Sequence, residues 1–230
     1  MNENSTKIYW KEKQKAAIEN MNKRNTCSGI LIEVAAQHPL KDGYIPNIEF
    51  QARLDAAIEL YDKKKTEGFD VEIYVPGSIH LNFEGVPDKI SLSAAGVNYL
   101  INHGIPPQII HGDDLNQKYD ELREHQGVYN SADECFVASK YFFEKDNYFR
   151  HCYSICSPNQ SFRKMLLYIE QGVYPKIITV PTDNMFHDFV KELFDSLPYV
   201  VSDDHDYQSK CSKEAIRTRK ERKPGYKNNL

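Results

Sequence analysis

The run GILIEVAA, residues 29–36, decides the fold class of this chain. It is short, apolar and rich in branched side chains, with Ser28 before it and Pro39 and Gly43 after it, as is typical of a buried strand. Residues 49–65 then carry apolar side chains at spacings of three and four, as on one face of a helix. These side chains are Phe50, Leu54, Ala57, Ile58 and Tyr61. Strand, polar loop and helix together make one α/β unit.

The same unit repeats along the rest of the chain. We expect four more strands in short apolar runs, at residues 71–77, 107–112, 152–157 and 176–181. We expect further helices at residues 7–22, 91–103, 130–143, 158–171 and 184–197. The polar residues 113–126 look like an insertion. Alternating short strands and helices require parallel crossovers, so the sequence predicts an α/β fold: a Rossmann-like doubly wound sheet of about five mainly parallel strands with helices on both faces.

Length and charge divide the chain into three parts. The 230 residues suit one large domain with tails. We expect an N-terminal helical arm at residues 1–24, an α/β domain at 25–200 and a flexible charged tail at 201–230. Apolar periodicity stops in this tail, whose acidic residues 203–206 suit a solvated segment better than an ion site, and basic residues gather at 217–227. The net charge of -4 gives no case for a nucleic-acid binder, and association with nucleic acid through the basic tail is the weakest of the functional hypotheses.

Cysteine usage and hydropathy point to a reducing compartment without a membrane. The five cysteines are odd in number and form no C-x-x-C pair. Cys152 and Cys156 lie four apart on one predicted strand and suit a buried core face, so we predict no metal site. The N-terminal residues are polar and charged, and no run approaches the about 20 apolar residues of a membrane span. We therefore expect a cytoplasmic protein, and the sequence leaves its oligomeric state open.

Ligands of open parallel sheets bind where the strands run out into loops at their carboxyl ends. The loop after residues 29–36 lacks the G-x-G-x-x-G dinucleotide fingerprint, and the chain has no Walker A motif. Residues 157–163, SPNQSFR, begin a helix directly after a strand. Free backbone N–H groups and the helix dipole favour an anion there, and Arg163 can add a bidentate contact. The segment is a candidate phosphate site, or an ordinary helix cap with a solvated arginine.

Two other segments at the predicted strand ends carry polar groups. Residues 130–134, NSADE, place a helix-capping Asn before carboxylates in the first turn, which serves either a plain helix start or a site. Residues 77–80, GSIH, bring a hydroxyl and an imidazole to the same edge. His80 is thus a candidate for proton transfer or a surface-loop histidine.

In their order and spacing, these segments resemble the SanA/YdcF/ElyC-like family, a bacterial group with a Rossmann-like core and poorly defined chemistry. The resemblance spans residues 29–181 and is carried by QARLDAAIELY, VPGS, SLSAAGVNYLINHGIP, NSADE and SPNQSFRKMLLYIEQG. In that family the motifs NT-x-E-N and TS-x-x-H-x-x-R line the pocket. The matching positions here are Asn130, Ser131, Asp133, Ser157 and Arg163. From the same matched segments we add Arg53, Gly77, Ser78 and Gln160 as ligand-binding candidates.

The resemblance implies a soluble protein that binds a phosphate-bearing or nucleotide-like small molecule, because the family binds such ligands, including S-adenosylmethionine in at least one member. A hydrolase or transferase acting on that ligand would use Asp133, Glu134 or His80 for proton transfer. Two departures favour a non-catalytic ligand sensor or partner-binding module instead. The family's glycine-rich turn is VAA at residues 34–36, and its junction histidine is Gln160, which cannot act as an acid or base near neutral pH.

Overall fold

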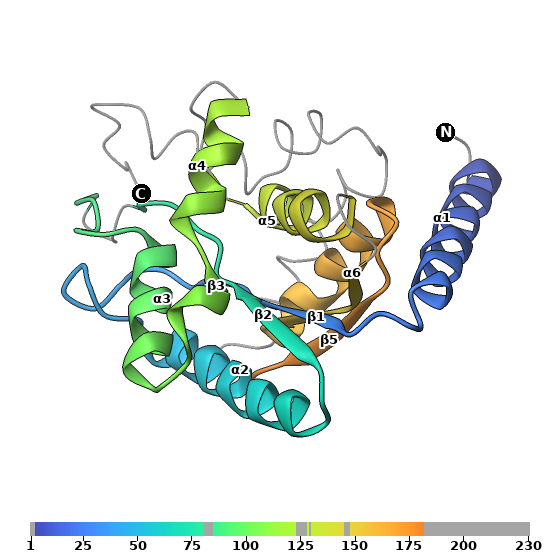
Figure 1. The fold of residues 1–230 in the computed structure, drawn as a ribbon. Helices are drawn as coiled ribbons and strands as arrows, with labels where there is room; N and C mark the ends of the chain where they lie inside the picture. The colour runs from blue at the N-terminus through green and yellow to red at the C-terminus, as the bar shows by residue number, and fades with distance from the viewer. Residues whose placement is uncertain (1–2, 81–84, 123–127, 129, 145–147, 182–230) are drawn as a thin grey trace.

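A five-stranded sheet forms the centre of the computed structural model (Figure 1). The structure describes residues 3–80, 85–122, 128, 130–144 and 148–181. The strands are β1 (Gly29–Val34), β2 (Asp70–Tyr74), β3 (Ile110–His111), β4 (Phe149–Cys156) and β5 (Pro175–Thr179). All neighbouring strands are parallel, in the order β3-β2-β1-β4-β5. The predicted α/β fold is therefore confirmed.

The strand order reverses once, between β1 and β4. From β1 the chain adds β2 and β3 on one side, and then returns to add β4 and β5 on the other side. β1 is thus the central strand, and its Ile32 pairs with Ile73 on one side and with Tyr153 on the other. Open α/β sheets bind ligands at such a reversal, so the ends of β1 and β4 are the first place to look for a site.

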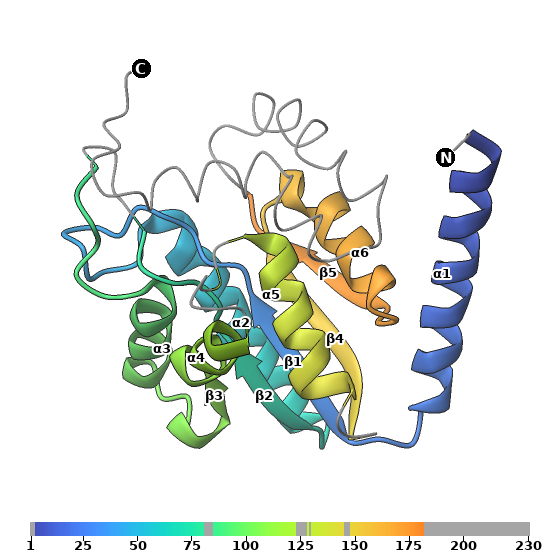
Figure 2. The same cartoon turned by 90° about the horizontal axis from the view of Figure 1, so that it is seen from above.

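Helices cover both faces of the sheet (Figures 1 and 2). One face carries α2 (Ile48–Thr66) and α3 (Leu92–Asn102), and the other carries α4 (Asp113–Leu122), α5 (Ser131–Ala138) and α6 (Ser161–Glu170). Side chains of a strand alternate between the two faces. Ile30 and Ile32 of β1 accordingly pack on the α2 side, while Leu31 joins the core under α5 and α6.

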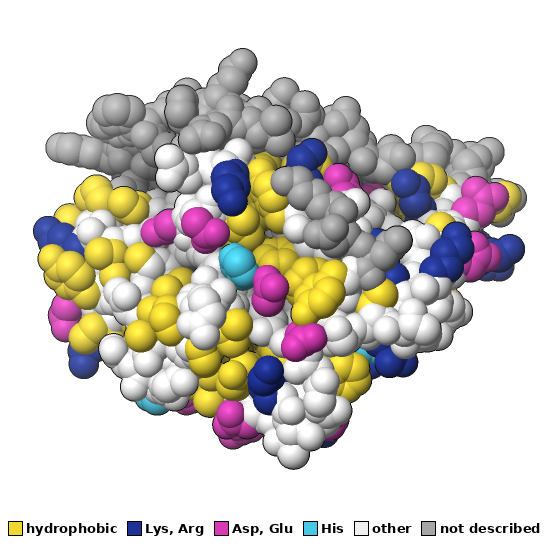
Figure 3. Space-filling view, in the orientation of Figure 1, with side chains coloured by type: hydrophobic (Ala, Val, Ile, Leu, Met, Phe, Trp, Pro, Cys, Tyr) yellow, Lys and Arg dark blue, Asp and Glu magenta, His cyan; other side chains and the backbone are white. Residues whose placement is uncertain are grey.

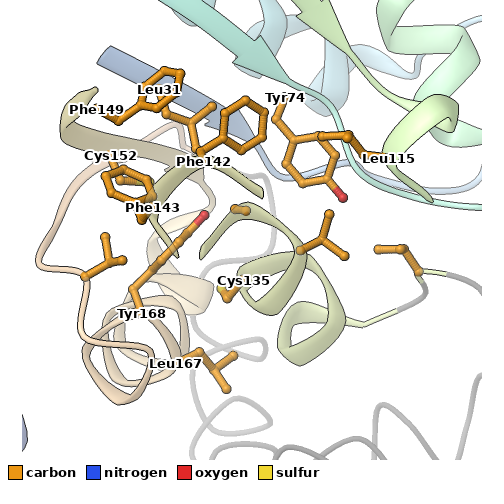
Figure 4. Close-up of a cluster of buried hydrophobic side chains, with 14 of the residues drawn as sticks. Leu31, Tyr74, Leu115, Cys135, Phe142, Phe143, Phe149, Cys152, Leu167 and Tyr168 are labelled. Atoms are coloured by element: carbon orange, nitrogen blue, oxygen red, sulfur yellow. The ribbon is translucent and has the colours of Figure 1, made fainter. Parts of the chain in front are cut away.

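The core under α5 and α6 is rich in aromatic side chains (Figure 4). The ring of Phe142 lies 6.1 Å from that of Tyr74 and 5.3 Å from that of Phe149, centroid to centroid. Phe142 belongs to a π-helical segment, Ser139–Glu144, that continues α5; π-helical turns are rare and frequently found at functional sites. Cys152 and Cys156 of β4 are both fully buried, which confirms their prediction as core residues.

Residues 113–126 are not the polar insertion that the sequence predicts, because most of them form α4. Asp113 and Asp114 stand in its first turn, where carboxylates suit the helix dipole. Leu115 and Tyr119, one turn apart, are only 5% and 1% exposed. Two apolar residues are enough to dock a short helix on the core, yet they are too few to form a visible apolar stripe in the sequence.

The helix predicted over residues 7–22 is present as α1 (Glu3–Lys23), which lies at the periphery beyond α6 in both views (Figures 1 and 2). Its Ala17 is fully buried, and Asn20 Nδ2 donates to the carbonyl of Gly172 at 3.2 Å. In the described part of the chain, no helix has an apolar stretch of the length that a bilayer crossing requires. The helix predicted at residues 184–197, the acidic run 203–206 and the tail 201–230 lie outside the described residues.

The edge strand β3 is held to β2 by side chains as well as by its backbone. His111 Nε2 lies 2.8 Å from Glu72 Oε2, and His111 Nδ1 lies 3.6 Å from Asp114 Oδ2. The hydrogen bond to Glu72 raises the pKa of His111 and outweighs the lowering that burial causes. The imidazolium is thus favoured in the folded protein.

A test follows from the direction of this shift. A histidine whose pKa is higher in the folded state stabilises the fold below its unfolded pKa of about 6.5, and this contribution is lost as the pH rises through the folded value. We expect Glu72→Gln to lower the pKa of His111 in an NMR titration and to flatten this part of the pH dependence of unfolding. Glu59→Gln, on the exposed side of α2, should change neither. An unaltered His111 titration in Glu72→Gln would contradict the pairing.

Candidate functional site

The carboxyl ends of β1 and β4 lie side by side. Val34, the last residue of β1, pairs with Ile155, and the next amide, Ala35 N–H, donates to the carbonyl of Ile155 at 2.9 Å. The loops that follow the two strands, at Ala36 and at Ser157, therefore leave the sheet next to each other. This is the point at which the strand order reverses.

Arg53 of α2 joins these two strand ends. It is 1% exposed, and Nη1 donates to the carbonyls of Ala35 at 2.9 Å and Ala36 at 3.3 Å. Nη2 donates to Gln37 Oε1 at 3.1 Å and to Ser157 Oγ at 2.7 Å. Burial lowers the pKa of Arg53 from its usual value. All the acceptors that Arg53 has in the described residues are neutral, so no carboxylate there bonds to its positive charge.

Ser157 and Gln160 form the start of the helix that follows β4. Residues Pro158–Gln160 make a 3₁₀ turn before α6, and Ser157 Oγ donates to Gln160 Oε1 at 3.1 Å. Gln160 thus takes part in the helix cap. Arg163, in the first turn of α6, is 3% exposed, so it is buried and not the solvated arginine of the alternative interpretation.

Asn130 caps α5, as the sequence predicts. Its Oδ1 accepts from the amides of Ala132 at 3.0 Å and Asp133 at 3.1 Å. Its Nδ2 donates to Asp133 Oδ2, and Tyr119 Oη donates to Asp133 Oδ1, both at 2.6 Å. Asn130, Ser131 and Asp133 are each 3% exposed. Both carboxylate oxygens of Asp133 are therefore already bonded within the protein.

A buried ion triad links β1, α5 and α6 directly below the strand ends. Lys164 Nζ lies 2.7 Å from Glu33 Oε1 and 2.5 Å from Glu134 Oε2. Ser154 Oγ of β4 donates to Glu33 Oε2 at 2.5 Å. The side chains of Lys164 and Glu33 are fully buried, and that of Glu134 is 12% exposed. Burial alone would lower the pKa of Lys164, but the attraction of Glu134 and Glu33 outweighs it and raises the pKa well above its usual value.

The sequence indicates Glu134 but neither Lys164 nor Glu33. Glu33 and Lys164 are separated by 131 positions along the chain, so no motif could bring them together. The one available signal is that a glutamate interrupts the apolar run GILIEVAA at residues 29–36. A charged residue inside a buried strand needs a buried partner.

The loop after β2 is tied to the segment that leads into α5. Ser78 N–H donates to the carbonyl of Val128 at 3.0 Å, and Val128 N–H donates to Ser78 Oγ at 3.1 Å. Gly77 has a φ of +114°, a conformation that side chains disfavour. His80 is 7% exposed and stacks on His38 at 5.1 Å between ring centroids. It is thus buried beside the loop after β1 and is not a surface-loop histidine.

The predicted residues therefore fall into three neighbouring sets. Arg53, Ser157 and Gln160 are bonded in a chain, Ser78 is bonded to the segment just before Asn130, and Glu134 is tied to Lys164, the residue after Arg163. Burial raises the pKa of the Cys156 thiol, at the end of β4, to about 12, which disfavours the thiolate that a nucleophilic cysteine needs. The described residues contain no cluster of three or more His, Cys, Asp or Glu side chains arranged to hold a metal ion.

No protein-family model matches the chain, and comparisons with curated proteins and with solved structures return no match either. The SanA/YdcF/ElyC-like assignment therefore stays a prediction from the sequence.

Proposed function

We propose that this chain binds a phosphate-bearing or nucleotide-like small molecule, such as S-adenosylmethionine, between the carboxyl ends of β1 and β4. The observation that carries the proposal is Arg53, a guanidinium that is 1% exposed at the reversal of the strand order and bonds to neutral acceptors among the described residues. A buried positive charge without a bonded carboxylate favours an anion nearby.

The first turn of α6 supplies a second reason for an anionic ligand. Arg163 lies in that turn and is buried, and the amino end of a helix carries the positive end of its dipole. The other cation of the turn, Lys164, is already neutralised by Glu33 and Glu134. Arg53 and Arg163 are both buried at this site, and we assign these two arginines to the ligand.

The non-catalytic form of this function, a ligand sensor or partner-binding module, is favoured by the state of the proton-transfer candidates. Asp133 accepts hydrogen bonds on both oxygens, Glu134 is paired with Lys164, and His80 is stacked on His38. The second candidate is a hydrolase or transferase acting on the same ligand. Glu134 favours it, because its partly exposed carboxylate lies in the first turn of α5. Turnover that is lost in Glu134→Gln would establish the enzyme.

We also propose a cellular location and a class of binding partner for this chain. A cytoplasmic site of action suits the three buried free thiols Cys135, Cys152 and Cys156. On the face shown in Figure 3, basic and acidic side chains are interspersed, which suits a small-molecule ligand better than a nucleic acid.

The proposal is tested by identifying what the protein retains. We expect mass spectrometry of the purified, denatured protein to release a phosphate-bearing or nucleotide-like compound. In calorimetry with that compound, or with S-adenosylmethionine and ATP, Arg163→Gln should weaken binding at least tenfold, as expected for a lost charged hydrogen bond. Arg150 lies near the amino end of β4, at the other end of the sheet. Arg150→Gln is therefore the matched control and should bind like the parent. Equal binding by the parent and Arg163→Gln would overturn the proposal.

A further inference from the structure

A second candidate site lies at the amino ends of the strands, at the opposite end of the sheet from the site just described. A small cavity separates the end of α1 from the starts of β4 and β5, and Arg24, Phe143, Arg150 and Tyr174 are among its lining residues. Its volume is about 10 Å³, which is room for one water-sized sphere. Two of the lining side chains are guanidinium groups, and none is a carboxylate.

Arg24 bonds to backbone carbonyls at this cavity. Its Nη2 donates to the carbonyl of Phe143 at 2.6 Å, and its Nη1 donates to that of Phe149 at 3.4 Å. Its guanidinium carbon lies 5.2 Å from the centre of the Phe143 ring. Burial lowers the pKa of Arg24. Phe143 belongs to the π-helical segment Ser139–Glu144, so the irregular end of this helix forms one wall of the cavity.

Arg150 of β4 is less completely bonded than Arg24. Its Nη2 makes a long hydrogen bond of 3.4 Å to Asn25 Oδ1, and its Nε is buried without an acceptor. Neither Arg24 nor Arg150 has a carboxylate partner in the part of the chain that the structure describes. Two cations thus line a cavity in which the described residues supply no countercharge and leave the Nε of Arg150 without an acceptor, and a buried donor without an acceptor is costly.

We propose that this cavity binds a single compact anion, a carboxylate group or a halide ion, between Arg24 and Arg150. The small volume admits one atom of the ligand, either a halide ion or one oxygen of a carboxylate group that reaches in from outside, and a whole phosphate or nucleotide does not fit. A carboxylate or halide would accept from the unbonded Nε of Arg150 and offset both charges. Because Arg24 follows α1 and Arg150 lies on β4, the anion also fastens α1 to the sheet.

The test measures the thermal stability of the full chain in sodium chloride, formate and acetate, with sodium sulfate at equal ionic strength as the large-anion control. We expect saturable stabilisation by at least one compact anion and none by sulfate beyond the ionic-strength effect. Chloride acting alone would identify a halide site, whereas formate and acetate acting alone would identify a carboxylate site. Stabilisation that is the same in all four salts, or that never saturates, would overturn the proposal.

Variants separate this cavity from the other site. Arg150→Gln should weaken the apparent affinity for the effective anion at least tenfold, while Arg150→Lys should retain part of it. Arg163→Gln, whose side chain belongs to the strand-end site, should respond to the anion like the parent. An anion response that survives in Arg150→Gln would also overturn the proposal, whatever the outcome of the nucleotide-binding experiments.

Discussion

Replacing Lys164 by methionine should lower the free energy of unfolding by about 3–5 kcal/mol, because it removes the shared partner of two buried carboxylates. Glu33 is fully buried in the central strand, and among the described residues its remaining hydrogen-bond partner would be the hydroxyl of Ser154. Methionine has nearly the same length as lysine and fills the space without a charge. The loss of stability therefore comes from the uncompensated carboxylates and not from a cavity.

Urea denaturation at pH 7 measures this difference, and the chain contains a matched surface control. Lys15 and Glu19 form an ion pair one turn apart on α1, with side chains 79% and 56% exposed. Lys15→Met should change the free energy of unfolding by less than about 0.5 kcal/mol. If Lys164→Met were no more destabilising than Lys15→Met, the buried triad would not exist in solution.

The pH dependence of the free energy of unfolding of Lys164→Met tests the buried triad independently. Without Lys164 the fold carries uncompensated negative charge, and protonation of the carboxylates removes it. We therefore expect the deficit of Lys164→Met to shrink as the pH falls from 7 to 5. The added change Glu33→Gln should recover part of the loss at pH 7 and make the deficit less dependent on pH.

The architecture of this chain is predictable from local patterns, because each strand carries its own signal. Apart from Glu33, the run at residues 29–36 is apolar on both faces, as is typical of a central parallel strand. The later runs and the helices between them repeat this signal, and the parallel order follows from their alternation. α4 escapes prediction because, in its described part, only two apolar side chains, Leu115 and Tyr119, are buried.

The site is less predictable, since its bonds join residues that are far apart in the sequence. Arg53 and Ser157 are 104 positions apart, and Lys164 and Glu134 are 30 apart. The sequence does predict the Asn130 cap, because a cap depends on residues two or three positions away. The sequence cannot show that the guanidinium of Arg53 donates to backbone carbonyls, because these hydrogen bonds depend on how α2 crosses the end of β1.

Replacing Arg53 by leucine should lower the free energy of unfolding by about 3 kcal/mol and loosen the strand ends locally. Four hydrogen bonds to the guanidinium disappear, and the carbonyls of Ala35 and Ala36 lose a charged donor. Amide exchange should therefore accelerate at Ala35, whose N–H bonds to Ile155 across the two strands. The amide of Ile30, near the start of β1, should change less.

Arg53→Lys and Ser157→Ala distinguish the structural role of Arg53 from its proposed attraction for a ligand. Lysine keeps the charge but not the planar fork, so Arg53→Lys should lose much of the stability that Arg53→Leu loses. Ser157→Ala removes one of the four acceptors and should cost about 1 kcal/mol. Lys65→Leu, on the exposed side of α2, controls for the change in composition.

Two outcomes for Arg53→Lys are informative. If Arg53→Lys were as stable as the parent, the planar guanidinium and its hydrogen bonds would not be what holds the ends of β1 and β4 together. If Arg53→Lys were destabilised yet bound the nucleotide-like ligand more tightly than Arg53→Leu, the positive charge would be the part of Arg53 that serves the ligand.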